Sequence, residues 1–419
     1  MTPRSLLFRA FGTAALLAAF VSCSENLDSS GACPVLCPQV GGDVQNVTID
    51  AVVLDTTVEA LSGLGNENGL FLASRGDTLD TRVIIRYDSL PQKFTPAGDT
   101  AQPITTVDSA YIQFMLDTVS IKGAGPVTIE AYDVDTTAND TSAAAVLALF
   151  RPDRLISSQT FARTDLTDSL KYFISNATVL SKIQSASRLR IGLRATSSES
   201  FQARFFSTEA GFPPLLTFRA TPDTATARQI VNPLSSTPAD EKLAAAHLGD
   251  YTLIAKAPPP AAQTDLAVGG LPPRRVYMRF DIPASIIDSS TVVRATLLLN
   301  QIPTALLDPT DTVRILPGLV LAGKAVKDPA KAAEIATDIA LDTVFVQPGG
   351  SGLTQVELAR AFAVWRTQSP DTTARAIVLR SLTEGLSPLE IAFSSSEAVT
   401  ALRPRLRISF VKRVPLGLP

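Results

Sequence analysis

The sequence predicts an all-β protein: two tandem antiparallel jelly-roll-like β-sandwiches with a few short helices, preceded by a signal peptide and a tether. Three observations support this prediction of the fold. Thr, Ser, Asp, Val and Pro are abundant while long Glu/Lys-rich stretches are few, a composition that favours strands over helices. Many short segments alternate apolar and polar residues. Several of these segments recur in the same order in the two halves.

Length and composition narrow the function as well as the fold. The 419 residues suffice for two domains and a tether. A charged share of 18% and a net charge of −3 give no electrostatic case for binding nucleic acid. The chain has one histidine, His247, and three cysteines, all near its start. Most nucleophilic and transition-metal chemistry needs more of these side chains. We therefore predict a protein that is not an enzyme and has no cofactor, although chemistry by carboxylates alone stays open.

Residues 1–23 have the composition of an export signal. Arg4 and Arg9 flank the start of an apolar run over residues 10–21, which is too short for a permanent membrane span. The run ends Ala-Ala-Phe-Val-Ser-Cys at Cys23, which resembles the lipobox of bacterial lipoproteins. The resemblance implies a lipid on Cys23. It also implies location at the outer membrane, because Ser24 is not the Asp that is associated with retention at the inner membrane. An ordinary cleaved signal peptide is the alternative.

Residues 24–44 form a polar tether that contains Gly, Ser and Pro. Cys33 and Cys37 lie in it, separated by three residues. In an exported protein whose Cys23 carries lipid, this remaining pair suggests a small disulfide-closed loop. A redox motif would have two intervening residues, and a metal site would need more ligands nearby.

The rest of the chain divides into two β-rich halves. We expect the first sandwich over 45–220, a Pro/Asp/Thr linker over 221–226, and the second sandwich over 227–413. The clearest matching segments are residues 82–88, Arg-Val-Ile-Ile-Arg-Tyr-Asp, and residues 275–281, Arg-Val-Tyr-Met-Arg-Phe-Asp. Five further pairs follow in the same order with a nearly constant offset, which indicates an internal duplication.

Helical patterns are few. Residues 239–247 and 326–339 have helical composition. Residues 353–367 carry apolar side chains near helical period, including Phe362 and Trp365, and should end before Pro370. We expect Trp365 to pack in a core rather than to bind sugar.

The order of these motifs is similar to that of a known domain family. The second half carries an Arg-x-x-x-Arg-Phe-Asp strand, a Thr-Val-x-x-Ala-x-Leu-x-Leu strand, a Leu-Thr…Trp element, and then Phe-x-Ser-x-Glu…Pro-x-Leu-x-Ile. This arrangement resembles the DNRLRE-type, carbohydrate-binding-module-96-like domain of bacterial cell-surface proteins. The first half resembles it more loosely and lacks the tryptophan. The resemblance implies a jelly-roll sandwich and, in some members, polysaccharide binding.

Charged residues recur at matching positions of the halves. Arg86 with Asp88, and Arg279 with Asp281, are expected to be structural pairs at strand ends; ligand contact is the alternative. Glu209 and Glu397 each follow a Ser or Thr. They stand in separate domains, so we expect them to brace neighbouring arginines rather than form the close acid pair of a glycoside hydrolase.

The expected function is that of a non-catalytic cell-surface lipoprotein, a binding or structural module that binds polysaccharide. The first alternative is an envelope structural or protein-interaction role without glycan binding. The second is a carboxylate-dependent hydrolase, which needs two acids lining one cleft. The expected partners are the membrane, through the lipid, and polysaccharide or envelope proteins. No metal site is expected.

Overall fold

The computed structural model describes residues 43–60, 65, 67–95, 100–136, 142–221, 228–234, 249–304, 310–320, 336–337, 342–367 and 375–413. Cys23, Cys33, Cys37, His247 and the expected helix at 239–247 lie outside these ranges, as do most residues of the expected helix at 326–339. None of the helices in the described ranges is long and apolar enough to cross a membrane. The protein is mostly β, with two large antiparallel sheets.

The first sandwich is an 11-stranded sheet folded on itself. It carries two short α-helices, α2 (Ala143–Leu147) and α3 (Asn176–Gln184), and a separate hairpin of β5 (Lys93–Phe94) and β6 (Gln102–Pro103). Its path runs β14 (Arg228–Val231), β13 (Leu215–Thr221), β7 (Thr106–Lys122), β12 (Phe201–Phe206), β3 (Gly69–Arg75), β4 (Leu79–Tyr87), β11 (Leu189–Thr196), β8 (Val127–Asp133), β9 (Leu155–Phe161); β10 (Ser169–Phe173) pairs with β7 and β15 (Asp250–Lys256) with β4.

The second sandwich is a 12-stranded sheet with the helices α4 (Ala284–Asp288) and α6 (Ala359–Thr367). Its path runs β1 (Gln45–Ile49), β25 (Arg405–Lys412), β18 (Ser290–Ile302), β24 (Glu390–Ser394), β16 (Asp265–Gly269), β17 (Arg274–Phe280), β23 (Ala376–Ser381), β19 (Val313–Val320), β20 (Ala336–Thr337); β22 (Gly352–Glu357) pairs with β18, β2 (Val52–Glu59) with β17 and β21 (Val344–Val346) with β19.

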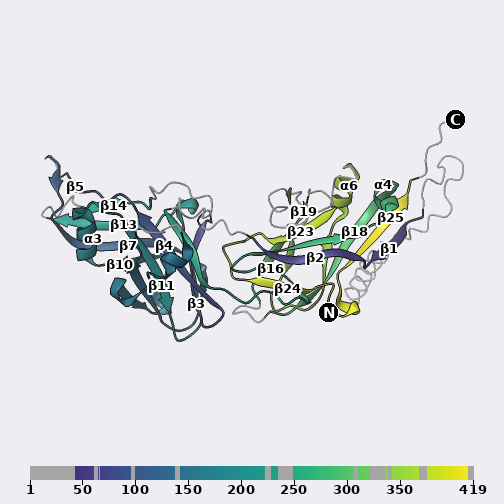
Figure 1. Ribbon diagram of the computed structural model, residues 1–419, viewed down its shortest axis with the longest axis horizontal. Coiled ribbons are helices and arrows are strands. Elements are labelled where there is room, and N and C mark those ends of the chain that lie inside the picture. The colour runs from purple at the N-terminus through teal and green to yellow at the C-terminus, as the bar shows by residue number, and fades with distance from the viewer. Residues whose placement is uncertain are drawn as a thin grey trace, which may run out of the picture.

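The two paths match position by position. The long strand β7 corresponds to β18, and the motif strand β4 (containing Arg82) corresponds to β17 (containing Arg275). The side strands match too, since β10 pairs with β7 as β22 pairs with β18. The expected all-β sandwich fold is confirmed, and the duplicated order of segments holds in three dimensions. Figure 1 shows the two sandwiches lying end to end.

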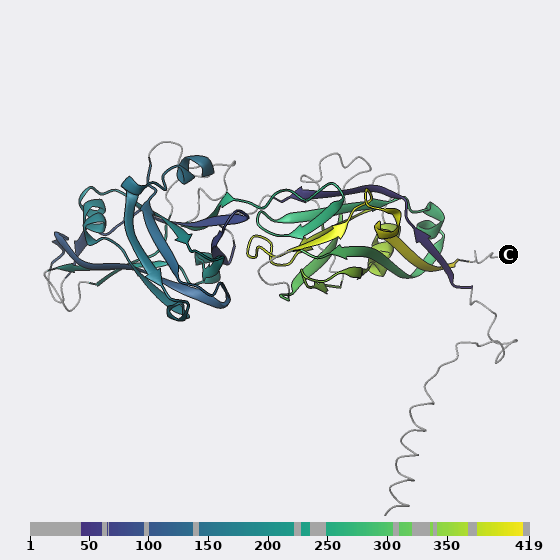
Figure 2. The ribbon, with the colours of Figure 1, turned by 90° about the horizontal axis from the view of Figure 1, so that it is seen from below.

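The strand pairing departs from the expected boundaries 45–220 and 227–413 in two places. β1 and β2 come first in the chain, yet they pair with β25 and β17 of the second sandwich. β14 and β15 come after the expected linker, yet they pair with β13 and β4 of the first. Figure 2 shows the purple N-terminal strands running along the second sandwich. We call each such strand pair the closing segment of the sandwich that receives it.

A second difference concerns residues 353–367. Only α6 is helical, because residues 352–357 form β22, which pairs with β18 from Thr296 to Gln301. Glu357 lies where the strand ends and the helix begins. Its Oε1 accepts from the backbone N–H of Ala295 in β18 at 3.1 Å and from that of Ala359, the first residue of α6, at 3.2 Å. The apolar spacing that predicted one helix fits a strand followed by a helix equally well.

Each sandwich has its own apolar core. In the first, inward side chains of β7, β13 and β11 such as Phe114, Phe218 and Ile191 are at most 1% exposed. In the second, Trp365 of α6 is 1% exposed and packs edge-on against Phe362 with ring centroids 5.1 Å apart. Trp365 is therefore a core residue, as expected.

The pairing predicts an unequal response to loss of the N-terminal strands. A chain that begins at residue 61 lacks β1 and β2, so backbone groups of β25 and β17 lose their partners at about 0.5–1.5 kcal/mol per hydrogen bond. We expect amide hydrogens of β17 and β25 to exchange at least tenfold faster, while those of β4 and β11 keep their rates, because the first sandwich is continuous from β3 to β15. Hydrogen exchange measured by mass spectrometry tests this. Equal loosening of both sandwiches would contradict it.

Candidate functional site

A carboxylate fixes the closing segment of the first sandwich. Asp250 Oδ2 of β15 accepts from the backbone N–H and the hydroxyl of Thr208, both at 3.0 Å. Asp250 is fully buried, and its second oxygen has no hydrogen-bond partner among the described residues. Burial, helped by the nearby charge of Glu209, raises the pKa of Asp250 to about 6.

The second sandwich repeats this contact. Asp55 of β2 lies opposite Met278 of β17, as Asp250 lies opposite Ile85 of β4. Asp55 accepts from the backbone N–H and the hydroxyl of Ser396, both at 2.6 Å. We call these two contacts the carboxylate latches. Thr208 and Ser396 immediately precede the two glutamates, Glu209 and Glu397, that the sequence singles out.

A second contact repeats beside each latch. The backbone N–H of Phe71 in β3 donates to Thr252 of β15 at 2.9 Å. The backbone N–H of Ala267 in β16 donates to Thr57 of β2, also at 2.9 Å. In both closing segments the threonine stands two residues after the latch aspartate, so one side of the strand carries both contacts.

A pocket of about 420 Å³ opens beside the latch of the second sandwich. Its charged lining comprises Asp55, Glu59, Asp265, Glu397 and Arg274. The guanidinium of Arg274 is buried and donates to Glu390 at 2.6 Å and to the carbonyl of Pro259 at 2.7 Å. We call this cavity the seam pocket, because β2 and the chain segment that enters the second sandwich form its walls. Four carboxylates and one guanidinium thus line one cavity.

The two expected Arg–Asp pairs lie in different environments. In the first sandwich, Arg86 Nη2 donates to Asp88 Oδ2 at 3.1 Å, and both side chains are at most 1% exposed. In the second, Arg279 is half-buried and Asp281 is exposed, with its backbone N–H donating to the carbonyl of Ala51. The Arg86–Asp88 ion pair is therefore buried inside the first sandwich and withdrawn from solvent.

Glu209 and Glu397 are exposed and stand on separate sandwiches. Glu397 accepts from the hydroxyl of Ser395 at 2.6 Å, and this hydrogen bond holds the pKa of Glu397 below its usual range. Glu209 acts on the pKa of Asp250, as described above. Both glutamates therefore stand beside a carboxylate latch, a link that their spacing in the sequence does not show.

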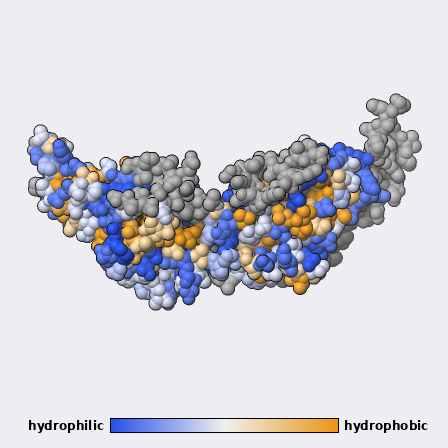
Figure 3. Space-filling view, in the orientation of Figure 1, coloured by the Kyte–Doolittle hydropathy of each residue, from blue (hydrophilic) through white to orange (hydrophobic). Residues whose placement is uncertain are grey.

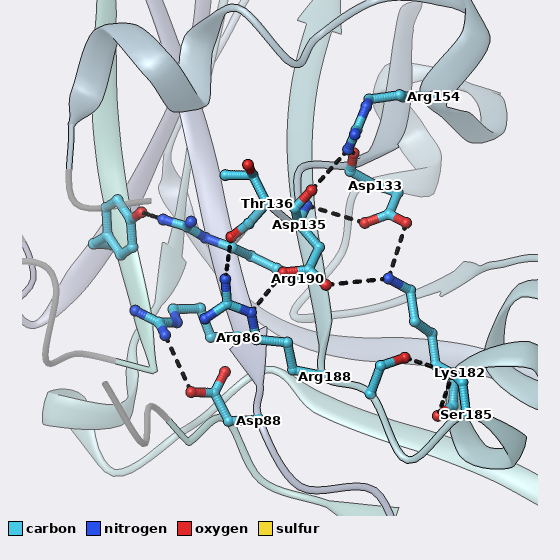
Figure 4. A network of polar contacts seen from close by, with 12 residues as sticks. Arg86, Asp88, Asp133, Asp135, Thr136, Arg154, Lys182, Ser185, Arg188 and Arg190 are labelled. Atoms are coloured by element: carbon cyan, nitrogen blue, oxygen red, sulfur yellow. Dashed lines mark hydrogen bonds and ion pairs between the residues drawn. The ribbon is translucent and has the colours of Figure 1, made fainter. Parts of the chain in front are cut away.

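Asp133 and Asp135 are paired with cations from α3 and from the residue just before β11. Lys182 Nζ lies 3.1 Å from Asp133 and 3.3 Å from Asp135, and Arg188 Nε lies 2.5 Å from Asp135. Figure 4 shows these side chains converging below Arg154. Burial opposes ionisation of Asp135, but Arg188 and Lys182 outweigh it, so its pKa is lowered. Among the described residues no group of three or more His, Cys, Asp or Glu side chains could hold a metal ion.

The outer face of the first sandwich carries a row of three apolar side chains and one threonine. Phe173 of β10, Tyr111 of β7, Thr217 of β13 and Ile230 of β14 lie side by side across four strands. Phe173 and Ile230 are 53% and 57% exposed. We call these four residues the aromatic row. Tyr111 is half-buried and Thr217 is buried, so the exposed apolar surface of the row comes from Phe173 and Ile230. Exposed apolar side chains on one face are a feature of interaction surfaces.

Cationic side chains border the aromatic row. Lys171 Nζ lies 5.2 Å from the centroid of the Tyr111 ring, and Arg228 donates to the Tyr111 hydroxyl at 2.8 Å. The rings of Tyr111 and Phe173 are 5.8 Å apart and tilted by 59°. They therefore form a ridge and not one flat platform.

The second sandwich provides an internal comparison. The four positions that match the aromatic row carry Glu357, Thr296, Arg407 and Thr48, paired across the corresponding strands. All four are polar; Arg407 and Thr48 are exposed, Glu357 is half-buried and Thr296 is buried. The apolar character of the row thus belongs to the first sandwich alone. Figure 3 shows hydrophilic and hydrophobic residues interspersed over the face of the molecule that it presents.

No family model matches the chain, and no curated protein matches it. Two solved structures align with it at low similarity. The C-terminal domain of the Streptococcus pyogenes antigen I/II-family protein AspA is 10% identical, with a TM-score of 0.16, over 84% of this chain and 92% of that one. The VP2 subviral particle of infectious bursal disease virus is 8% identical, with a TM-score of 0.10, over 87% and 78%. The fold assignment rests on the strand pairing of the chain itself.

The buried latch of the first sandwich predicts a specific pH dependence. The pKa of Asp250 is about 6 in the folded chain against an ordinary value of 3.8. The folded state binds this proton more tightly, so the contribution is fully present below about pH 4 and is lost as pH rises through 6. Asp250 alone should raise the free energy of unfolding by roughly 3 kcal/mol between pH 7 and pH 4.

Urea unfolding of the wild type and of Asp250→Asn across this pH range measures the effect. The amide keeps an acceptor for Thr208 but does not titrate, so the difference between the two curves should change with pH in the direction given. Parallel curves would show that Asp250 titrates normally in the folded chain.

Proposed function

We propose that the protein is a non-catalytic binding module of the bacterial cell surface, held by a lipid at Cys23, that binds its partner on the outer face of the first sandwich. The observation that carries this proposal is the aromatic row, whose matching positions in the second sandwich are polar. Duplicated sheets place similar structural demands on matching positions, so the divergence at Phe173, Tyr111 and Ile230 supports a separate role for this face of the first sandwich.

The path of the chain agrees with such a display. β1 follows directly on the tether, and it pairs with β25 in the second sandwich. An anchor ahead of residue 43 would therefore hold the second sandwich near the membrane. The first sandwich, at the far end in Figure 1, would carry the aromatic row outward.

Polysaccharide is the first ligand class for this face, as the resemblance to a carbohydrate-binding family implies. The exposed ring of Phe173 can pack against the C–H face of a sugar, and Lys171, Gln113 and Arg228 can donate to its hydroxyls. An envelope protein is the second class. The aliphatic Ile230 and Leu215 and the tilt between the two rings favour it, because interface centres combine aromatic, aliphatic and Arg side chains.

The hydrolase alternative keeps one supporting observation, since four carboxylates line the seam pocket. Glycoside hydrolysis needs one acid and one base or nucleophile separated by about 5–10 Å. Three of the four already serve other contacts. Asp55 accepts from Ser396, Glu397 from Ser395 and Asp265 from the hydroxyl of Thr264. Turnover of polysaccharides that disappears in Glu59→Gln would favour the hydrolase over the binding module.

Truncation of the aromatic row should weaken binding. We expect Phe173→Ala combined with Tyr111→Ala to weaken retardation in polysaccharide gels, or crosslinking to an envelope protein, by about tenfold or more, because central aromatic side chains dominate interfaces. Phe345→Ala is the matched control, since Phe345 is 63% exposed but lies on the second sandwich. Equal losses in both variants would rule out the aromatic row as the site.

Lipid attachment is tested separately. Cys23→Ser removes the acyl acceptor, and without chains that contribute about 0.8 kcal/mol per buried CH₂ the protein should move from the membrane fraction to the soluble fraction. Cys33→Ser, in the same tether, is the control and should leave the distribution unchanged. Membrane retention of the Cys23→Ser protein would contradict the anchor.

A further inference from the structure

The second sandwich contains a receiving site for a two-strand segment. One part lies along β25, where Gln45–Ile49 pairs with residues 406–410, and the other lies along β17, where β2 pairs with residues 274–280. Without a closing segment, both strands would present unpaired backbone N–H and C=O groups. Such edges accept an added strand readily.

The hydrogen bonds of this site select particular side chains of the bound strand. Ser396 donates twice to Asp55, and the backbone N–H of Ala267 donates to Thr57. In the first sandwich, Thr208 and Phe71 make the same contacts with Asp250 and Thr252. Each closing segment thus presents Asp-x-Thr in extended conformation. The ligand class is an extended peptide strand that carries this pattern.

The two closing segments differ in how firmly they are packed. In β15 of the first sandwich, the side chains of Asp250, Tyr251, Thr252 and Leu253 are all buried. In β1 and β2, Ile49 alone is buried, and the other residues are half-buried or exposed. The N-terminal segment is therefore held mainly by backbone hydrogen bonds and the latch. Elements with few buried apolar contacts open at the lowest free energy cost.

We propose that the receiving site of the second sandwich also binds the N-terminal segment, residues 45–59, of a second copy of this chain. The second copy offers the same Asp-x-Thr strand to the same contacts, so closure within one chain and exchange between chains differ chiefly in effective concentration. The crossing 60–68 can span on the order of 30 Å when extended, which permits a reach between neighbouring molecules. This inference rests on the strand pairing and is independent of what the aromatic row binds.

Two cysteine variants test the exchange. Asn46 and Ser409 face each other across β1 and β25, with their side-chain oxygens 2.6 Å apart, and antiparallel neighbours lie within disulfide range. One chain carries Asn46→Cys and the other Ser409→Cys, both with Cys33→Ser and Cys37→Ser. When they are mixed under mild oxidant, a mixed disulfide dimer forms only if β1 of one copy enters the other. Its yield should rise about tenfold for each tenfold rise in chain concentration while it is the minor species.

Latch variants make the test directional. Asp55→Ala in the chain with Ser409→Cys weakens that chain's own closing segment, so the dimer should increase several-fold. Asp55→Ala in the chain with Asn46→Cys weakens its segment equally in its own site and in the site of the other copy, so the dimer should stay near its original yield. Lys171→Cys, exposed on the first sandwich, replaces Asn46→Cys as the control for random collision. A yield no higher than this control, or one indifferent to where Asp55→Ala is placed, overturns the proposal.

A second measurement avoids cysteines. A fluorescent peptide of residues 43–60 is added to the wild-type chain and to its Asp55→Ala variant, and anisotropy is followed. Binding should be tighter to the variant, whose own segment competes less, and a peptide with Thr57→Val should bind more weakly. Absence of peptide binding to both chains, with circular dichroism unchanged, also overturns the proposal.

Discussion

The backbone hydrogen bonds of β4 and β17 are the constraint on which the architecture depends. Each of these motif strands runs through the middle of its sandwich and has one side that its own half does not fill completely. A buried strand with unpaired N–H and C=O groups is costly. The missing partner is supplied by β15 in one case and by β2 in the other. The latches, the seam pocket and the discontinuous second sandwich all follow from this requirement.

Much of this fold could be predicted from local patterns. Alternation in residues 82–88 and 275–281 identified β4 and β17, and the ordered repeats anticipated that the two sandwiches share one topology. The pairing of the closing segments could not be predicted in this way. Ser396 and Asp55 are separated by 341 positions, and a short alternating strand does not indicate which edge it joins. The prediction of one helix over residues 353–367 was wrong for a related reason, because the same apolar spacing fits a strand followed by a helix.

The candidate site was less accessible to sequence reasoning. The recurring charged residues in the sequence include Arg86 and Asp88, which are buried. They also include Glu209 and Glu397, which stand beside the latches. The aromatic row escaped because Phe173, Tyr111 and Ile230 come from three separate segments and become neighbours only through strand register. A signal was nevertheless present: once the halves are aligned strand by strand, these positions change from apolar in one to polar in the other.

The adjacency of β1 and β25 has a consequence for how this chain could be rearranged. Gln45 lies opposite Phe410, so the start and the end of the folded chain meet in neighbouring strands. The strands β1 and β2 precede the first sandwich in the chain but belong to the second, whose remaining strands follow the first sandwich. A circular permutant that joins residues 413 and 43 through a short loop and opens the chain between Lys256 and Asp265 would turn both sandwiches into continuous domains without altering one strand pair. The boundary of a repeat in the sequence need not coincide with the boundary of a folded domain.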